Sequence, residues 1–250
     1  MKKHLIYSIF FLIYFSCQNP KNPTKQAGIC LSFDDKSVNE WYELLPLFKK
    51  YNATATFFVT QPQELNDEEI QKLQQLEKAG FEIGFHGYHH KSAEHYIRKH
   101  SYKEYMETEI YPGIQFMDSI GVNCRSFAYP YGAQYWFTDY LLLRHFDAVR
   151  DVSPLNKEKD LTNIDAIFND FRGDKSLSAI GIDNKTGLTI SMINQAFDRA
   201  KKNREAVLLY GHIPTDEDRV KGYYFQKKFL EEILKSAQNK NLVFYTISGL

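Results

Sequence analysis

Residues 80–90 have the sequence Gly-Phe-Glu-Ile-Gly-Phe-His-Gly-Tyr-His-His, a short apolar run that ends in a cluster of histidines. His86 and His90 stand four positions apart in this cluster. Earlier in the chain, the apolar run of residues 28–33 ends in two carboxylates, Asp34 and Asp35. Two strands that each end in residues of the metal-ligand type predict one metal site, at one rim of a barrel or sheet.

The chain from residue 28 onward alternates between strand patterns and helix patterns. Strands are expected at residues 29–33, 55–59, 81–85, 125–128, 147–151, 178–182, 206–210 and 242–246. Helices are expected at residues 37–51, 66–80, 101–121, 138–146, 189–203 and 222–239, with an interruption at Pro112-Gly113. Strands separated by helices of this length pair in parallel through right-handed crossovers. About seven such units in one domain predict an α/β fold of the TIM-like (β/α) barrel type.

The first 17 residues have the pattern of a targeting segment. Lys2 and Lys3 precede an apolar run over residues 5–15, which is shorter than a membrane span. Ser16 and Cys17 then resemble the end of a bacterial lipobox. We therefore expect a signal peptide over residues 1–17 with lipidation at Cys17, a polar tether over 18–27 and one folded domain over 28–250. This organisation predicts a protein of the bacterial cell envelope, lipid-anchored to a membrane; an uncleaved anchor and ordinary secretion are the alternatives.

The charges of the 250-residue chain balance, with 31 lysines and arginines against 31 aspartates and glutamates. No long run of basic residues occurs, so the composition gives no support for nucleic-acid binding. Aromatic residues are frequent, with 17 Tyr, 19 Phe and 2 Trp. Exposed rings would suit stacking on sugar faces, although composition alone does not separate them from core residues.

Asp34 and Asp35 could serve one site although adjacent side chains on an extended strand point in opposite directions. A turn just past the strand end can present both carboxylates, so that one binds a metal while the other stays free as a base. His86 and His90 could bind the same ion, and two histidines with one carboxylate leave positions open for water and substrate. A pair of acids at a helix start and a histidine-rich surface loop are the alternatives. For the two histidines together with Asp35, we favour the metal.

Two further segments follow predicted strands on the same rim. The turn over residues 129–132, Tyr-Pro-Tyr-Gly, could aim backbone N–H groups at a developing oxyanion. His212 follows the apolar strand at residues 206–210, where it is well placed to act as a general acid. An ordinary aromatic turn and a partly exposed loop histidine are the structural alternatives.

These motifs, in this order, resemble those of the polysaccharide deacetylase family, carbohydrate esterase family 4. They lie at residues 32–35, 86–90, 127–132 and 208–212, and together they span most of the chain after residue 28. The resemblance implies a distorted (β/α) barrel of about seven units. It implies a divalent metal, usually Zn²⁺ with Co²⁺ or Ni²⁺ as alternatives, held by Asp35, His86 and His90. Asp34 would then be the general base, His212 the general acid, and the backbone N–H of Tyr131 an oxyanion donor.

The chain departs from the family pattern in four places. Lys36 stands where the first motif usually continues with Gly. Gly87 stands where Ser or Thr is usual. Ala128 stands where the family often has the arginine that partners the catalytic base, and we expect Arg150, or else Arg125, to replace it. The family's aspartate-containing motif, which tunes the acid, has no clear copy here, and Asp151 is the candidate.

The resemblance implies a metal-dependent hydrolase that removes acetyl groups from an N-acetylated glycan, acting on carbon–nitrogen bonds other than peptide bonds. One alternative is a lipid-anchored glycan-binding protein that has lost activity, and Ala128 is its best support. The other is an esterase that removes O-acetyl groups from a polysaccharide. The expected partners are the glycan and, through the lipid anchor, a membrane.

Overall fold

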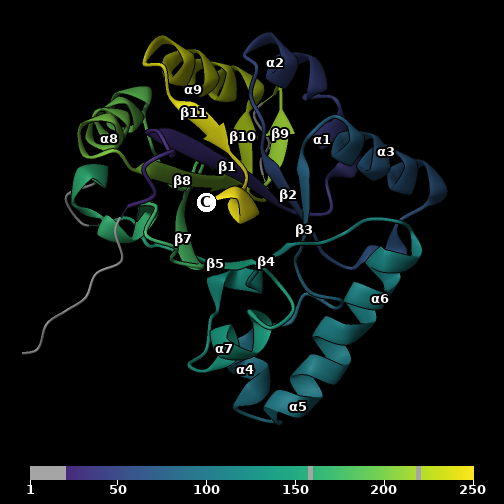
Figure 1. The fold of residues 1–250 in the computed structure, drawn as a ribbon. Helices are drawn as coiled ribbons and strands as arrows, with labels where there is room; N and C mark the ends of the chain where they lie inside the picture. The colour runs from purple at the N-terminus through teal and green to yellow at the C-terminus, as the bar shows by residue number, and fades with distance from the viewer. Residues whose placement is uncertain (1–20, 157–159, 218–220) are drawn as a thin grey trace, which may run out of the picture.

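The computed structural model of the protein describes residues 21–156, 160–217 and 221–250 (Figure 1). The predicted signal peptide over residues 1–17, with Cys17, and the first three residues of the predicted tether lie outside these ranges. The rest of the tether contacts the domain, because the Asn22 N–H donates to the Phe171 carbonyl (2.9 Å) and Lys21 Nζ donates to the Asn203 carbonyl (2.8 Å). None of the described helices is long and apolar enough to span a membrane.

Parallel strands close into a barrel in the described part of the chain. The ring consists of β1 (Gly28–Asp35), β2 (Thr56–Val59), β3 (Glu82–Phe85), β4 (Ser126–Ala128), β5 (Ala148–Val152), β7 (Ser176–Gly181) and β8 (Ala206–Gly211). The pairing of β8 with β1 over six residues of each strand closes it. The predicted TIM-like barrel of about seven units is therefore confirmed, with strands that range from three residues in β4 to eight in β1.

Further strands of the described chain lie outside this ring. β11 (Val243–Tyr245) pairs with the first three residues of β1, and β2 pairs with the last four, so both lie along one edge of β1. β6 (Phe168–Asn169) pairs antiparallel with the start of β8. β9 (Ile213–Thr215) and β10 (Tyr224–Gln226) form a separate two-stranded sheet. Because residues 224–226 are taken up by β10, the helix predicted from residue 222 begins only at residue 227.

Helices cover the outside of the barrel (Figure 1). One group consists of α1 (Val38–Tyr42), α2 (Leu45–Lys50), α3 (Asp67–Lys78), α8 (Ile190–Asn203) and α9 (Lys227–Asn239). The other group, drawn in teal, consists of α4 (Ala93–Ile97), α5 (Tyr102–Tyr105), α6 (Tyr111–Ser119) and α7 (Thr138–Leu142). Two predicted helix starts are confirmed, since Asn66 forms a capping box with Glu69 ahead of α3 and Thr189 caps α8. The helix predicted over residues 37–51 divides into α1 and α2, because Pro46 in the first turn of α2 has no N–H to continue the ladder.

Residues 102–119 form one continuous helical segment, whereas the sequence predicts an interruption at Pro112-Gly113. Met106–Ile110 form a π-helical turn, η2, between α5 and α6. Pro112 lies in the first turn of α6, and the wider π turn just before it accommodates the missing backbone N–H. A Cβ at Gly113 would overlap the ring of Phe85, so the helix packs directly on β3, the strand that precedes His86.

Side chains of the barrel strands alternate between the barrel interior and the layer beneath the helices. On β1, Ile29, Leu31 and Phe33 belong to the outer apolar core, which the helices complete. Cys30 belongs instead to the interior, where small and apolar side chains from several strands meet. By the same alternation, Ser32 and Asp34 face the interior.

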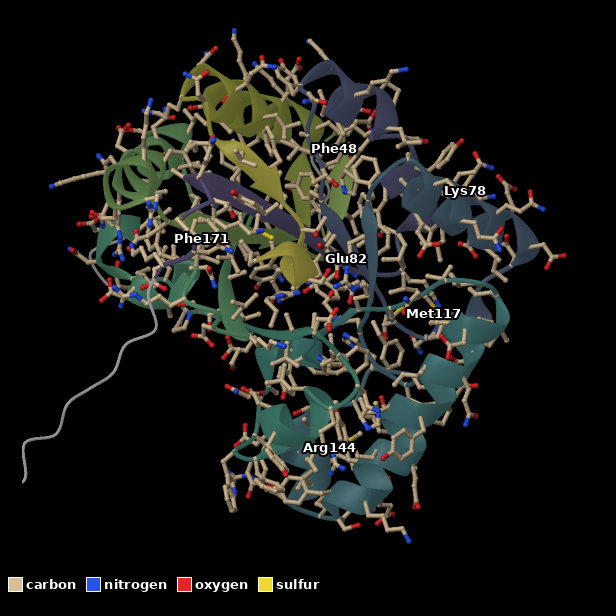
Figure 2. All side chains as sticks on the ribbon, viewed as in Figure 1. Phe48, Lys78, Glu82, Met117, Arg144 and Phe171 are labelled. Carbon is tan, nitrogen blue, oxygen red and sulfur yellow. The ribbon has the colours of Figure 1, made fainter. Side chains whose placement is uncertain are left out.

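Hydrogen-bonded polar groups around the Glu82 carboxylate close the amino-terminal end of the barrel. Glu82, labelled near the barrel centre in Figure 2, accepts hydrogen bonds from the hydroxyls of Thr56 (3.1 Å) and Ser126 (2.6 Å). Its carboxylate also accepts the N–H of Ser248 (3.0 Å), which lies in the short turn η6 (Ile247–Gly249). The carboxyl-terminal end of the barrel is left for the candidate site.

Candidate active site

The predicted site residues lie at the carboxyl-terminal ends of β1, β3 and β8. Asp34 and Asp35 end β1, His86 follows β3, and His212 follows β8. Strand alternation alone would turn Asp35 away from the rim. Its backbone has a φ of +86°, in the left-handed region, and this turn directs its side chain toward His86 and His90. Both adjacent carboxylates therefore reach one site.

Asp35, His86 and His90 form a cluster whose three ligand atoms lie within 4.8 Å of one another. Asp35 Oδ1 is 3.8 Å from His86 Nε2 and 3.4 Å from His90 Nε2. The two Nε2 atoms are 3.3 Å apart. The fold thus brings together the three residues that the sequence predicts as metal ligands.

The donor atoms and charge states of this cluster fit a divalent cation. His86 Nδ1 lies 2.8 Å from the Ala128 carbonyl, so this nitrogen carries the proton and the Nε2 lone pair faces the cluster. Burial lowers the pKa of His86 to about 4, so its imidazole is neutral. Burial acts to raise the pKa of Asp35, but the hydrogen bond with His90 and the neighbouring imidazole charges lower it to about 2. A neutral imidazole and an ionised carboxylate are the forms that bind metals, and two nitrogens with one oxygen suit Zn²⁺, Co²⁺ or Ni²⁺.

Asp34 is buried against Arg150, the residue expected to replace the arginine missing at Ala128. Arg150 Nη2 donates to Asp34 Oδ1, and both side chains are buried. In the pairing of β4 with β5, Ala128 lies directly opposite Arg150, so the cation reaches the carboxylate from the neighbouring strand. Arg125, the other candidate, instead forms an ion pair with Asp147 on the exposed surface.

His212 contacts a carboxylate that the sequence analysis did not identify. His212 Nδ1 lies 2.7 Å from Asp183 Oδ2, and the His212 N–H donates to Asp183 Oδ1 (3.0 Å). The prediction of Asp151 is wrong, because its carboxylate accepts a hydrogen bond from the Ser178 hydroxyl instead. Burial acts to lower the pKa of His212, but the hydrogen bond with Asp183 and the charge of Asp34 raise it above its usual value. An imidazole that stays protonated over a wider pH range suits a general acid.

A signal for Asp183 was present in the sequence. This residue lies two positions after the end of β7, the same kind of position that supplied the other site residues. The surrounding segment, residues 152–188, has scattered Pro, Asn, Asp and Gly and no clear periodicity. The strand predicted over residues 178–182 nevertheless ends directly before Asp183, so the rule that indicated the other site residues also applies to this one.

Tyr131 lies on the same rim, in a turn with a left-handed backbone conformation (φ +62°). Its ring is exposed and packs on the ring of His90, with centroids 4.6 Å apart. Among the described residues, the N–H of Tyr131 has no hydrogen-bond partner. The predicted turn therefore contacts the ligand cluster and keeps a backbone donor available for an acceptor.

Comparisons with known proteins agree with this geometry. A family model with the description polysaccharide deacetylase matches residues 21–144, which contain Asp34, the three clustered ligands and Tyr131. Arg150, Asp183 and His212 lie beyond the matched range. No curated protein matches the chain significantly.

Several solved structures share the fold. The CE4 domain of a multidomain xylanase from the hindgut metagenome of Trinervitermes trinervoides has a TM-score of 0.51 and 20% identity, covering 90% of this chain and 89% of that chain. A family 4 acetyl xylan esterase from Clostridium thermocellum, solved with a cobalt ion, has a TM-score of 0.52 and 18% identity over 88% of each chain. The catalytic domain of a peptidoglycan N-acetylglucosamine deacetylase from Eubacterium rectale has a TM-score of 0.53 and 16% identity over 92% of each chain. At these identities the likeness establishes the barrel.

Proposed function

Because the chain belongs to the polysaccharide deacetylase family, we propose that it is a metal-dependent hydrolase that removes acetyl groups from an N-acetylated glycan. The bond cleaved would be a carbon–nitrogen bond other than a peptide bond. The observation that carries the proposal is the cluster of Asp35, His86 and His90, with Asp34 and His212 on the same rim. Hydrolysis of an acetyl group can use side chains that bind a metal ion, together with a carboxylate that acts as a base and an imidazole that acts as an acid. This site offers all three.

Asp35, His86 and His90 would hold the divalent cation, most simply Zn²⁺. When bound, such an ion supplies Lewis acidity, which lowers the pKa of water and polarises a carbonyl. His86 already has its orientation fixed, because its Nδ1 proton is donated to the Ala128 carbonyl.

Asp34 is assigned as the general base, which accepts a proton from the water that attacks the acetyl carbonyl. Arg150 supplies the opposite charge and fixes the orientation of this carboxylate. Because both side chains are buried, their interaction is little screened by solvent. Arg150 is thus a positioning residue for the base.

His212 is assigned as the general acid, which gives a proton to the departing amine nitrogen. Its Nδ1 is held by Asp183, so Nε2 is the atom that delivers the proton. An amine leaves poorly unless it is protonated, so amide hydrolysis depends on this residue. The Tyr131 N–H would donate a hydrogen bond to the carbonyl oxygen as negative charge develops on it.

Ala128, in place of the usual arginine, is the residue that would favour an impaired glycan-binding protein. The Arg150–Asp34 contact weakens that argument, because a cation still accompanies the carboxylate. An O-acetyl esterase would use the same machinery, but an alcohol leaving group needs less help from His212.

Acetate release from a panel of N-acetylated and O-acetylated glycans, with and without a chelator, tests the proposal. We expect release from N-acetylated glycans that stops with chelator and returns with Zn²⁺, and loss of release in the control variant Asp34→Asn. A His212→Ala variant should lose far more amide hydrolysis than ester hydrolysis. Release that chelator does not affect would contradict the metal-dependent function.

A further inference from the structure

Glu109 is a buried carboxylate that the proposed mechanism does not use. It lies in the π-helical turn η2, and its side chain is 0% exposed. An ionised carboxylate is costly to bury unless hydrogen bonds or opposite charges compensate it. The partners of Glu109 therefore indicate what this carboxylate is for.

The polar contacts found for Glu109 among the described residues all go to the loop that carries His90. Glu109 Oε2 accepts the backbone N–H groups of His89 (3.0 Å) and Lys91 (3.2 Å). Glu109 Oε1 lies 2.9 Å from His89 Nδ1, and the Glu109 carbonyl accepts the Tyr88 N–H (3.1 Å). The backbone on both sides of His90 is thus fixed to one side chain.

This loop needs support because His90, a residue other than glycine, has a left-handed backbone conformation. Gly87 has a φ of +89° and His90 a φ of +57°. A residue other than glycine persists in this region only where the surroundings impose it. A Cβ at Gly87 would lie 3.2 Å from Glu109 Oε2, so the loop and the carboxylate are closely packed.

The π turn explains how a helix presents a carboxylate to this loop. An extra residue in one turn changes the direction of the side chains around it, and such turns are frequent at functional sites. Met106 and Ile110 of the same turn are buried in the apolar core, which fixes the turn in place. Glu109 is therefore held on a rigid element, while the loop depends on it.

We propose that Glu109 is a positioning residue of the metal site, which holds residues 87–91 so that His90 Nε2 faces His86 and Asp35. The inference rests on the metal-dependent function proposed above, because only there does His90 act as a ligand. The hydrogen bonds from the N–H groups beside His90 are strengthened by the negative charge of the carboxylate, and without this charge they weaken and the loop relaxes. Metal affinity then falls although no ligand has been removed.

Zn²⁺ affinity of the metal-free protein tests this inference, measured by competition with a coloured chelator. Partners that orient metal ligands typically change affinity when they are mutated, and we expect Glu109→Gln to weaken Zn²⁺ binding about 10- to 100-fold. The matched control is Glu107→Gln, an exposed glutamate on the same turn, which should bind Zn²⁺ within about twofold of the wild type. The visible absorption of bound Co²⁺ should change for Glu109→Gln and not for Glu107→Gln.

Unchanged Zn²⁺ affinity and an unchanged Co²⁺ spectrum in a folded Glu109→Gln variant would overturn the inference. If Glu109→Gln does not fold, His89→Ala removes one contact at the exposed side of the loop, and a several-fold loss of affinity is then expected. No loss in that variant would overturn the inference as well. A wild-type protein that binds Zn²⁺ but releases no acetate would contradict the proposed deacetylation, and the affinity test would still decide the role of Glu109.

A separate observation concerns the groove beside His90, which has a volume of about 410 Å³. Lys91 and Lys99 line it together with the rings of Tyr96 and Tyr131, and no acidic side chain does. Lys91 Nζ lies 4.8 Å from the centre of the Tyr96 ring. Clefts lined by one sign of charge concentrate ligands of the opposite sign.

The acidic residues nearest in sequence to this groove already have partners. Glu94 forms an ion pair with Arg98 (2.7 Å), and Glu104 lies 3.1 Å from His100 Nδ1. The two lysines therefore define the charge of the groove, and the rings offer flat apolar faces. From this combination we infer that the groove binds a sugar unit that carries a carboxylate, adjacent to the acetylated sugar; this rests on the proposed function.

Binding of two matched N-acetylated oligosaccharides, one with uronic acid units and one neutral, tests this second inference. Calorimetry with the Asp34→Asn protein avoids turnover. Replacing Lys91 and Lys99 together by Gln should weaken binding of the acidic oligosaccharide about tenfold. The affinity for the neutral oligosaccharide should stay within about twofold of that of the protein with both lysines. The control is Lys202→Gln, an exposed lysine on α8. Equal changes for both oligosaccharides would overturn the inference, and the result does not depend on catalysis.

Discussion

At the scale of single residues, Asp34 has the cation of Arg150 beside it. Ala128 occupies the position where the family often has this arginine. The register of β4 and β5 places Arg150 opposite Ala128, so the guanidinium reaches the carboxylate from the next strand. The sequence indicates Arg150 as a candidate because this residue lies on the predicted strand that follows the strand of Ala128. It could not show that Arg125 is held elsewhere, since its partner Asp147 is known only from the fold.

Arg150→Ala should lower kcat for acetate release about 100-fold. The substitution leaves the carboxylate of Asp34 buried without its cation, and a misplaced base typically loses this much. The substrate KM should change little, because Arg150 is buried and does not face solvent. Steady-state kinetics on an N-acetylated oligosaccharide measures both quantities.

A rescue variant distinguishes this role from a general loss of packing. Ala128→Arg combined with Arg150→Ala returns an arginine to the usual family position, on the strand that directly neighbours the altered one. Partial recovery of kcat is expected for the double variant. If Arg150→Ala retains full turnover, the charge on Asp34 does not need this partner.

The alkaline limb of the pH profile should depend on Asp183. As the general acid, His212 must be protonated, so activity falls as pH rises through its pKa. The contact with Asp183 helps to raise that pKa against the opposing effect of burial. Asp183→Asn should therefore move the alkaline limb of kcat/KM to lower pH. Asp151→Asn, a change to a carboxylate without contact to His212, is the control and should leave the limb in place.

At the scale of elements, the loop after β3 explains why glycine replaces the usual hydroxyl residue at position 87. Its φ of +89° lies where side chains are disfavoured, and Glu109 and Pro130 both approach within 3.2 Å of an added Cβ. In this chain a carboxylate from the π turn supports the loop. A hydroxyl at position 87 is therefore not needed, and there is little room for one.

Gly87→Ser should destabilise the protein although it restores the residue usual in the family. A left-handed conformation costs a side-chain-bearing residue about 1–2 kcal/mol, and the crowding against Glu109 adds to this. Chemical denaturation measures the change in the free energy of unfolding. Gly80→Ser is the matched control for a positive φ, since a Cβ there meets no atom within 4 Å and only the backbone cost remains. A Gly87→Ser protein as stable as the wild type would contradict this account.

Elements were predictable where a local pattern determines them. The strands β1 and β3, which lead to the paired carboxylates and to His86, and the capped start of α3 at Asn66 follow from apolar runs and cap residues. The left-handed φ of Asp35 and the π turn that carries Glu109 depend on tertiary contacts instead. These two features complete the candidate site, and no periodicity reveals them.

At the scale of the whole molecule, the described domain begins close to the predicted lipidation site. Residues 21–26 contact the folded domain, as in the Asn22–Phe171 hydrogen bond. A lipid on Cys17 would therefore keep the domain near the bilayer. We propose this arrangement as the cellular location of the enzyme, in the bacterial cell envelope.

Replacing Cys17 by Ser should release the protein from membranes. Labelling with a radioactive fatty acid in a bacterial host should mark the wild type and not Cys17→Ser, and the wild type alone should sediment with membranes. Cys124→Ser, a half-buried free thiol in the domain, is the control and should retain the label. Label that persists in Cys17→Ser would contradict the predicted lipobox.

Metal binding should stabilise the whole domain, because the ligands come from two elements that are far apart in the chain, the end of β1 and the loop after β3. A ligand that binds only the folded state stabilises it by about 2.7 kcal/mol at one hundred times its Kd. For a domain of this size, that corresponds to a rise in Tm of roughly 5–10 °C. Thermal unfolding of the metal-free protein with added Zn²⁺ should show this rise, and chelator should reverse it. Asp34→Asn keeps all three ligands and should retain the rise, whereas His90→Ala, which removes one ligand from the cluster, should lose most of it. The same Tm with and without Zn²⁺ in the wild type would mean that the cluster does not hold the ion.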